Sequence, residues 1–280
     1  MRGGVAVPPA GTTGAVHLPE ASRRVFAPVV NRRQWVIRAL PLVSPGALLL
    51  TWEVAARAGL VSRLFFPAPS VIVTTLAGMI ASGELWAHLS ISLQRVAWGF
   101  LVGAIPAVVL GLAMGWSGKV RILFEPLISS TLPIPKLVVL PIIMLIFGIG
   151  EPSKVVIVAV GAFYPAVINA AAGVTGIREV YFEVARNFGA TRWQKFWKVV
   201  LPGSLPMVFA GLRLAFGMAL LMAVASEFVA ARRGIGALIW LSWETLRTDK
   251  LYAGIAAWAM VGVLSSALLG SVQRYVVRWE

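Results

Sequence analysis

The sequence predicts an all-α integral membrane protein with six transmembrane helices. Of its 280 residues, 59% are hydrophobic and only 13% are charged, and the mean hydropathy is +0.84. A soluble globular protein carries about 25% charged residues. Several apolar stretches approach the ~20 residues that a helix needs to cross the hydrocarbon core of a bilayer. No pattern of alternating polar and apolar residues is present, so helices rather than the strands of a barrel are expected.

The six predicted spans leave a tail at the N-terminus. Residues 1–35 are rich in Gly, Pro, Ala and Arg and lack the continuous apolar core of a signal peptide, so we expect a cytosolic tail followed by a transmembrane domain at 36–280. The apolar stretch Ser70–Ala81 is too short to span, and we predict an amphipathic surface helix that is capped by Ser70. The spans are Ile37–Ala58, Val96–Trp116, Leu123–Phe147, Val155–Val174, Pro206–Val229 and Leu251–Val277.

Composition and motifs argue against other classes of protein. The net charge of +14 is typical of nucleic-acid-binding proteins, but here apolar segments of membrane length separate the positive residues. Cysteine is absent, and His17 and His88 are far apart, so we expect neither disulfides nor a metal site. Gly118 and Lys119 are followed by valine and do not form the P-loop that binds ATP. The scattered charges indicate no catalytic residues and therefore no enzyme.

The positions of lysine and arginine predict which side of the membrane each loop faces. With the N-terminus in the cytosol, 15 positive residues lie on the cytosolic side and eight, including Arg95 and Lys154, in loops on the opposite side. Loops on the cytosolic side usually carry the excess of positive charge. Both termini and the segment 176–204 are therefore predicted to be cytosolic.

A charged and aromatic insert, Glu183–Pro202, stands within segment 176–204 between two apolar stretches. Apolar residues recur at helical spacing before Gly189, which can adopt the left-handed conformation that ends a helix. Thr191 and Gln194 have the spacing of a capping box, which predicts the start of a second helix. The insert is thus expected to form two helices joined by a glycine corner.

The end of the insert predicts a turn before the next span. Leu201 and Pro202 close the insert, Ser204 is placed to cap the following helix, and Pro206 falls in its first turn. Such a corner could fit a groove on a partner protein, or its tryptophans could rest at the level of the lipid headgroups.

The insert also matches a known pattern: E-A-A, three residues, G, nine residues, I-x-L-P. Only Val184 and Val199 depart from it. In this respect the chain resembles the membrane permease subunits of bacterial ATP-binding-cassette (ABC) importers. The resemblance implies the MetI-like permease fold of type I ABC importers, and it makes segment 176–204 the coupling loop that fits a cleft in an ATPase subunit. The residues that it assigns to this contact are Glu183, Val184, Ala185, Arg186, Gly189, Ala190, Leu201 and Pro202.

The same resemblance implies partners and a location. Two separate ABC ATPase subunits would bind ATP and Mg, so this chain needs no cofactor of its own. A second permease copy, identical to the first, would complete the pathway, and a periplasmic or lipid-anchored substrate-binding protein would deliver the solute. The chain would cross the bacterial inner membrane several times, in contact with lipid and without a nucleic-acid partner.

Further stretches resemble one branch of this family, the permeases for nitrate, sulfonates, taurine and bicarbonate. The implied function is ATP-driven import of a small oxyanion or organosulfonate by alternating access. The alternatives are a stand-alone secondary transporter or channel for a small anion, and a membrane anchor for a cytosolic complex. The stretches are FPAPSVI near Pro67, GELWAHLSISLQRVAWGF from Gly83, LPIPKLVVLPIIMLIFGIGEPSK from Leu132 and GLRLAFGMALLMAVASEF from Gly211.

Three charged residues are candidates for the translocation pathway: Lys136, Arg213 and Glu227. A charge inside a bilayer is costly and usually faces the bundle interior, a partner or water. Arg213 can instead extend to the cytosolic face, and Glu227 can make a structural or gate contact near the outer end. Arg213 and Glu227 are about 21 Å apart along a straight helix, so they cannot pair with each other in one copy.

Small residues and prolines indicate how the spans are built. Small residues recur at every fourth position of the second span and predict close helix packing. Prolines in the third span indicate either a plain kink or a break that lines a cavity. Gly234 and Gly236, followed by Leu238–Trp243, suggest a short gate-like helix outside. The small residues are Gly99, Gly103, Ala107, Gly111 and Gly115, and the prolines are Pro126, Pro133, Pro135 and Pro141.

Overall fold

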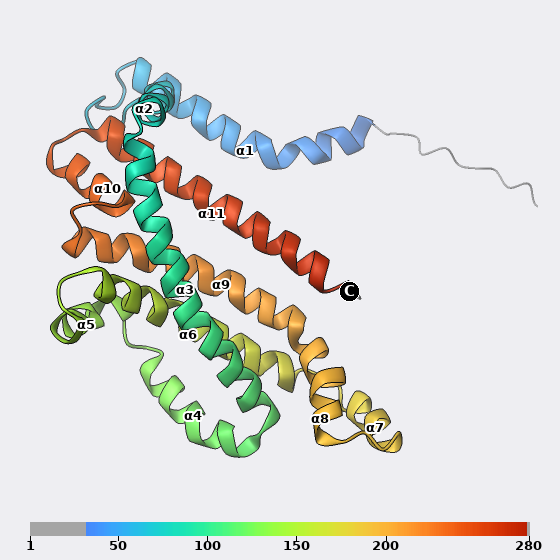
Figure 1. Ribbon diagram of the computed structural model, residues 1–280. Helices are drawn as coiled ribbons and strands as arrows, with labels where there is room; N and C mark the ends of the chain where they lie inside the picture. Colours follow the sequence, from blue (N-terminus) through green and yellow to red (C-terminus); the bar gives the residue numbers. More distant parts are fainter. Residues whose placement is uncertain (1–31, 279–280) are drawn as a thin grey trace, which may run out of the picture. The chain divides into compact units, whose positions relative to one another are not determined.

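The computed structural model describes residues 32–278, with side chains from Val43 onward except that of Ala230. The chain divides into two units, Met1–Leu48 and Leu49–Glu280. In the described part every regular element is helical, which confirms the predicted class (Figure 1). The α-helices are α1 (Arg32–Arg57), α2 (Pro69–Ala81), α3 (Glu84–Trp116), α4 (Gly118–Thr131), α5 (Leu140–Phe147), α6 (Glu151–Thr175), α7 (Glu179–Asn187), α8 (Arg192–Lys195), α9 (Leu201–Ala230), α10 (Ile235–Glu244) and α11 (Thr248–Val276). A 3-10 helix, η1 (Lys136–Val139), precedes α5, and a π-helix, η2 (Phe196–Val200), precedes α9.

Four helical segments in the described part are long and apolar enough to span a membrane, and α4 with η1 and α5 makes a fifth if the bent pair counts as one span. These five coincide with the second to sixth predicted spans. The first predicted span, Ile37–Ala58, falls within α1, but the side chains of its residues 37–42 lie outside the described part. The first predicted span, and with it the count of six spans, therefore stays a prediction. Residues 1–31 of the predicted tail also lie outside the described residues.

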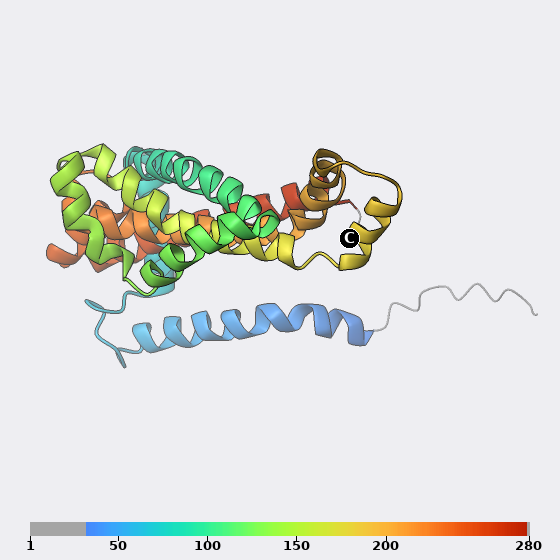
Figure 2. The ribbon, with the colours of Figure 1, turned by 90° about the horizontal axis from the view of Figure 1, so that it is seen from below.

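The core of unit Leu49–Glu280 lies between α3, α6 and α9. Their buried apolar side chains form one cluster, in which Ala104 of α3, Ile157 of α6 and Ala219 of α9 are at most 1% exposed. A second cluster joins α2, α3, α10 and α11 at one end of this unit. Figure 2 shows α7 and α8 beyond the other end, where α6 ends and α9 begins.

The row of small residues in α3 packs closely against another helix, as predicted, and the structure shows that this helix is α6. A Cβ atom at Gly103 would overlap the backbone carbonyl of Ala159, and one at Gly111 would overlap that of Val167. The two backbones therefore approach too closely to admit a side chain at these glycines.

The start of α2 differs from the prediction. The helix begins at Pro69 with Ala68 as its N-cap, so Ser70 does not cap it. Instead, the carboxylate of Glu53 in α1 accepts hydrogen bonds from the amide of Ser70 at 2.9 Å and from its hydroxyl at 2.8 Å. A carboxylate from another helix thus satisfies a free amide in the first turn of α2.

The third predicted span is broken at its prolines. η1 and α5 leave the axis of α4 at an angle of 92°. The Lys136 ammonium donates hydrogen bonds to three backbone carbonyls at 2.8–3.0 Å, those of Thr131, Leu132 and Ile134. The ammonium thus supplies hydrogen bonds to backbone carbonyls at the point where the helix is interrupted. The ammonium also lies 3.9 Å from the ring centroid of Tyr164 in α6, so Lys136 ties the break to the core.

We predict that Gly103→Ala destabilises the protein by about 1–3 kcal/mol, because the added methyl group forces α3 away from α6. The apparent Tm of the purified protein in detergent measures this effect. Gly217→Ala in α9 is the matched control, since a Cβ there meets no atom within 4 Å. This control should be neutral or stabilising by up to about 1 kcal/mol, because alanine favours a helix over glycine. Equal Tm values for the two variants would contradict the packing argument.

Candidate functional site

The glycine corner of the coupling segment forms as the sequence predicts. Gly189 follows the end of α7 with a φ of 68°. Its amide donates to the carbonyl of Arg186 at 2.9 Å, and the amide of Ala190 donates to the carbonyl of Ala185 at 2.9 Å. These two hydrogen bonds form a Schellman motif, in which glycine takes the left-handed position at no steric cost. We call α7, this turn and α8 the elbow, residues 179–195.

The second helix of the elbow begins with the predicted capping box. The Thr191 hydroxyl accepts the amide of Gln194 at 3.3 Å, and the Gln194 side chain accepts the amide of Thr191 at 2.9 Å. Both ends of the corner are therefore closed by local hydrogen bonds, which fix the direction of α8 relative to α7.

The predicted turn after the elbow is absent. α8, η2 and α9 run on as one helix from Arg192 to Val229, 38 residues long. The Ser204 hydroxyl donates to the carbonyl of Leu201 at 3.0 Å inside this helix and caps nothing, and Pro206 also lies within it. Pro202 cannot donate an amide hydrogen bond, and the π-helix η2 precedes it where the helical bonding changes register.

Aromatic packing holds the elbow on the transmembrane helices. The Trp116 ring at the end of α3 lies 6.2 Å from the Phe182 ring of α7 and 6.3 Å from the Phe196 ring of η2. In contrast, Phe188 is 87% exposed and Trp193 is 69% exposed. One aromatic set therefore anchors the elbow, and the other is presented outward.

The residues that the family pattern assigns to coupling have different surroundings. Glu183 is exposed, and no hydrogen bond or ion pair within the described residues engages its carboxylate. Val184, Ala185 and Pro202 instead line a groove of about 630 Å³ between α7 and the start of α9. Arg186 forms an exposed ion pair with Glu179 at 2.7 Å.

The remaining assigned residues shape the elbow or lie beside it. Gly189 and Ala190 form its turn, and Leu201 is half-buried at the start of α9.

The three candidate pathway residues lie far apart. Lys136 lines a pocket of about 370 Å³ beside the broken span, so the break borders a cavity. Arg213 is exposed, and its guanidinium donates to the Gln273 side chain of α11 at 2.7 Å. Glu227 lies near the opposite end of α9 and is 1% exposed. The structure therefore does not bring these three charges into a single site.

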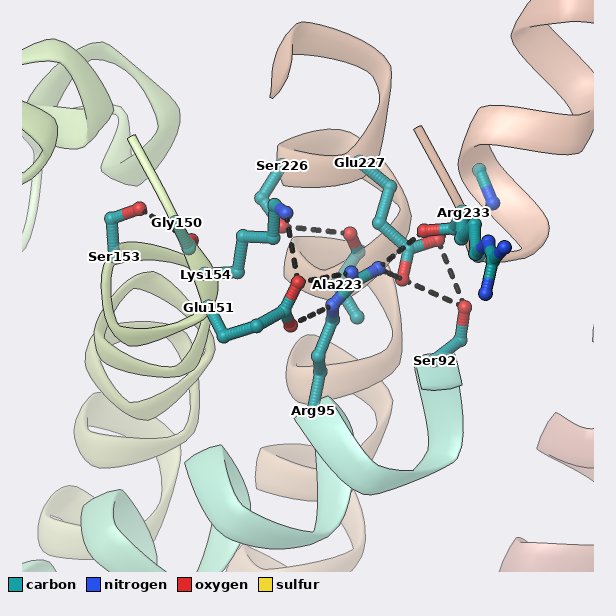
Figure 3. Close-up of polar contacts among 12 residues, drawn as sticks. Ser92, Arg95, Gly150, Glu151, Ser153, Lys154, Ala223, Ser226, Glu227 and Arg233 are labelled. Carbon is teal, nitrogen blue, oxygen red and sulfur yellow. Dashed lines mark hydrogen bonds and ion pairs between the residues drawn. The ribbon is translucent and has the colours of Figure 1, made fainter. Parts of the chain in front are cut away.

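Glu227 is enclosed by a polar network that sequence reasoning missed. Its carboxylate accepts hydrogen bonds from the Arg95 guanidinium at 2.7 Å and from the Ser92 hydroxyl at 2.7 Å (Figure 3). It also accepts one from the amide of Gly236 at 2.7 Å. A Cβ atom at Gly234 or Gly236 would meet this carboxylate, so both glycines are needed for its approach to α10. Glu227 thus makes structural contacts, which were the alternative to a direct role in the translocation pathway.

Arg95 extends the network to α6. Its Nε and Nη2 atoms donate to both oxygens of Glu151 at 2.6 Å, and Lys154 donates to the same carboxylate at 3.1 Å. Arg95 and Lys154 are 3% and 4% exposed, which corrects their assignment to loops. The reason is that α3 and α6 begin earlier than predicted and each buried cation finds a carboxylate. In sequence, Arg95 is separated from Glu151 by 56 residues and from Glu227 by 132, so no local spacing signals the contacts.

The chain is similar to known membrane proteins over most of its length. Residues 107–279 match the family described as binding-protein-dependent transport system inner membrane component. The chain belongs to this family. The helical bundle and the elbow are therefore those of an ABC importer permease, as the resemblance implied.

Relatives of this permease are similar over most of their length. The chain is 36% identical over 239 residues to a putative aliphatic sulfonates transport permease protein of Bacillus subtilis, covering 85% of this chain and 87% of the relative. It is 36% identical over 238 residues to the taurine transport system permease protein of Escherichia coli, covering 83% and 86%. A nitrate import permease protein of Leptolyngbya laminosa is 34% identical over 195 residues, 70% of each chain.

The family membership sets the general role of the chain. It is a multi-pass membrane protein that acts as the transport subunit of an importer, and its relatives are transport permeases rather than enzymes.

We predict that Glu227→Gln destabilises the permease by about 3 kcal/mol, because it removes one member of a buried ion pair. Unfolding in mixed detergent and sodium dodecyl sulfate micelles measures the change. Glu125→Gln is the control, since Glu125 pairs with Arg121 at 2.8 Å on an exposed helix face, where a pair contributes only about 0–1 kcal/mol. Equal losses in the two variants would show that the network does not stabilise the fold.

Proposed function

We propose that this permease imports a small organosulfonate or a related oxyanion by alternating access. Sulfonates, taurine and nitrate, the solutes in the names of its relatives, are small molecules that carry an anionic group. In this proposal, a substrate-binding protein delivers the solute to the end of the bundle opposite the elbow. A second, identical copy of the chain completes the pathway. Lys136 and Arg213 are the candidate cations along it, and Glu227 holds the helices around it.

The elbow is proposed as the docking site for an ABC ATPase subunit, one on each permease copy. Glu183 offers an exposed carboxylate without an internal partner, and Phe188 offers a large exposed apolar side chain. Large apolar anchors within a polar rim are a common arrangement at protein interfaces. The ATPase subunits bind ATP and Mg, and no cofactor binds to this chain.

One observation carries the coupling proposal more than any other: the elbow is continuous with a transmembrane helix. The segment Arg192–Val229 contains α8 of the elbow and all but the last residue of α9. Movement of a docked ATPase can therefore be transmitted to the bundle without passing through a flexible loop.

The proposed topology places both termini and the coupling segment 176–204 in the cytosol, with residues 1–35 as a cytosolic tail. The permease lies in the bacterial inner membrane.

We expect Glu183→Gln to weaken the association of the permease with its ATPase by about tenfold or more, because a hydrogen bond to a charged group contributes about 1.5–3 kcal/mol. Binding is measured between the purified permease in nanodiscs and the purified ATPase. Glu179→Gln is the matched control, since this second glutamate of α7 is also exposed but is already paired with Arg186. Equal binding by the wild type and both variants would refute the docking role of Glu183.

The solute is tested by whole-cell uptake of radiolabelled taurine, ethanesulfonate and nitrate in strains with and without the permease gene. Loss of uptake of at least one of the three is expected on deletion. Uptake that continues without the ATPase would instead favour the stand-alone transporter. Unchanged uptake of all three would contradict the proposed solute class.

A further inference from the structure

A pocket of about 810 Å³ lies beside the buried network, at the end of the bundle opposite the elbow. Its walls come from α3, from the start of α6 and from the segment between α9 and α10. Four cationic side chains line it, those of Arg95, Lys154, Arg232 and Arg233, together with one carboxylate, that of Glu151. The pocket is therefore strongly basic.

The cations of the pocket are not all balanced. The two buried cations of the network are matched by its two carboxylates, one of them outside the pocket lining. Arg232 and Arg233 are exposed, and neither guanidinium has an ion-pair partner among the described residues. The pocket thus retains a surplus of two positive charges, which attracts anions from solution.

The contacts of Glu151 show what kind of group the buried donors bind. Its carboxylate takes a bidentate contact from Arg95 at 2.6 Å and a third contact from Lys154 at 3.1 Å. Yet the Glu151 side chain is 60% exposed, whereas those of Arg95 and Lys154 are only 4% and 6% exposed. The anion is therefore the member of this trio that can rotate into solvent.

If Glu151 rotated into solvent, Lys154 would lose its carboxylate partner and Arg95 would keep only Glu227. Unpaired buried charge is costly, so a second anion in the pocket would take over the same donors. The planar fork of an arginine suits the paired oxygens of a carboxylate, a sulfonate or a phosphate equally well.

We propose that this pocket binds a small tetrahedral oxyanion, the sulfonate group of a solute or free sulfate, in exchange with the carboxylate of Glu151. Arg95 and Lys154 hold the oxyanion, and Arg232 and Arg233 attract it. A phospholipid phosphate has the same chemistry, but we assign the site to a soluble ligand because the pocket is charged on several walls. The nature of the solute rests on the proposed function, whereas the exchange with Glu151 does not.

Isothermal titration of the purified permease with ethanesulfonate and with sulfate tests the site, in nanodiscs of neutral phosphatidylcholine. Glu151→Gln should tighten binding by about tenfold, because the competing carboxylate is gone. A merely structural role for Glu151 predicts no gain in affinity.

The double variant Arg232→Gln/Arg233→Gln provides a second measurement that leaves the buried network intact. It should weaken binding by about tenfold, since it removes the two unpaired charges. Arg247→Gln is the matched control, an exposed arginine outside the pocket lining, and should leave the Kd unchanged.

An unchanged Kd in both the Glu151 variant and the double variant would overturn the proposal. Loss of ethanesulfonate binding in nanodiscs that contain phosphatidylglycerol would show that the headgroup of an anionic lipid occupies the pocket, and the soluble ligand would be wrong. Binding that responds to the variants, in a permease whose deletion leaves uptake of taurine, ethanesulfonate and nitrate unchanged, would reject the proposed function but support the pocket.

Discussion

The buried contact between Arg95 and Glu227 fixes how the helices meet at the end of the bundle away from the elbow. Arg95 stands on α3, Glu227 on α9, and the second carboxylate on Arg95 comes from α6. An ion pair removed from water stabilises only if its remaining hydrogen-bonding groups are satisfied, and here the hydroxyl of Ser92 and the backbone amide of Gly236 donate to the carboxylate of Glu227. The three helices that pack the core are therefore also the three that share one charge network.

This network depends on close packing. The small residues of α3 let its backbone lie against α6, and this proximity brings Arg95 within reach of Glu151. The glycines that begin α10 play the same part for Glu227, because any side chain there would displace its carboxylate. Glycine thus has two uses in this fold, one in helix packing and one in the approach of a charge to a backbone amide.

Features that depend on neighbours in the chain were predictable from the sequence. The left-handed turn at Gly189 and the capping box at Thr191 are of this kind, since each closes within a few residues. The turn expected near Ser204 was wrong, because a π-helix lets the chain pass Pro202 without leaving the helix.

Features that depend on residues distant in the chain were not predictable. The Glu53 carboxylate at the start of α2 and the partners of Arg95 come from other helices. A lone arginine or lysine is rarely buried, so Arg95 and Lys154 were placed in loops. Only the fold reveals the carboxylates that make their burial tolerable.

The continuous helix from Arg192 to Val229 has a geometric consequence. Its 38 residues span about 57 Å at a rise of 1.5 Å per residue, nearly twice the ~30 Å thickness of a hydrocarbon core. If the helix crosses the bilayer upright, the excess length lies outside the hydrocarbon core and is covalently one piece with the membrane-embedded part. A displacement of the helix end at Arg192 is therefore transmitted through one continuous helix to Glu227, some 50 Å away along it.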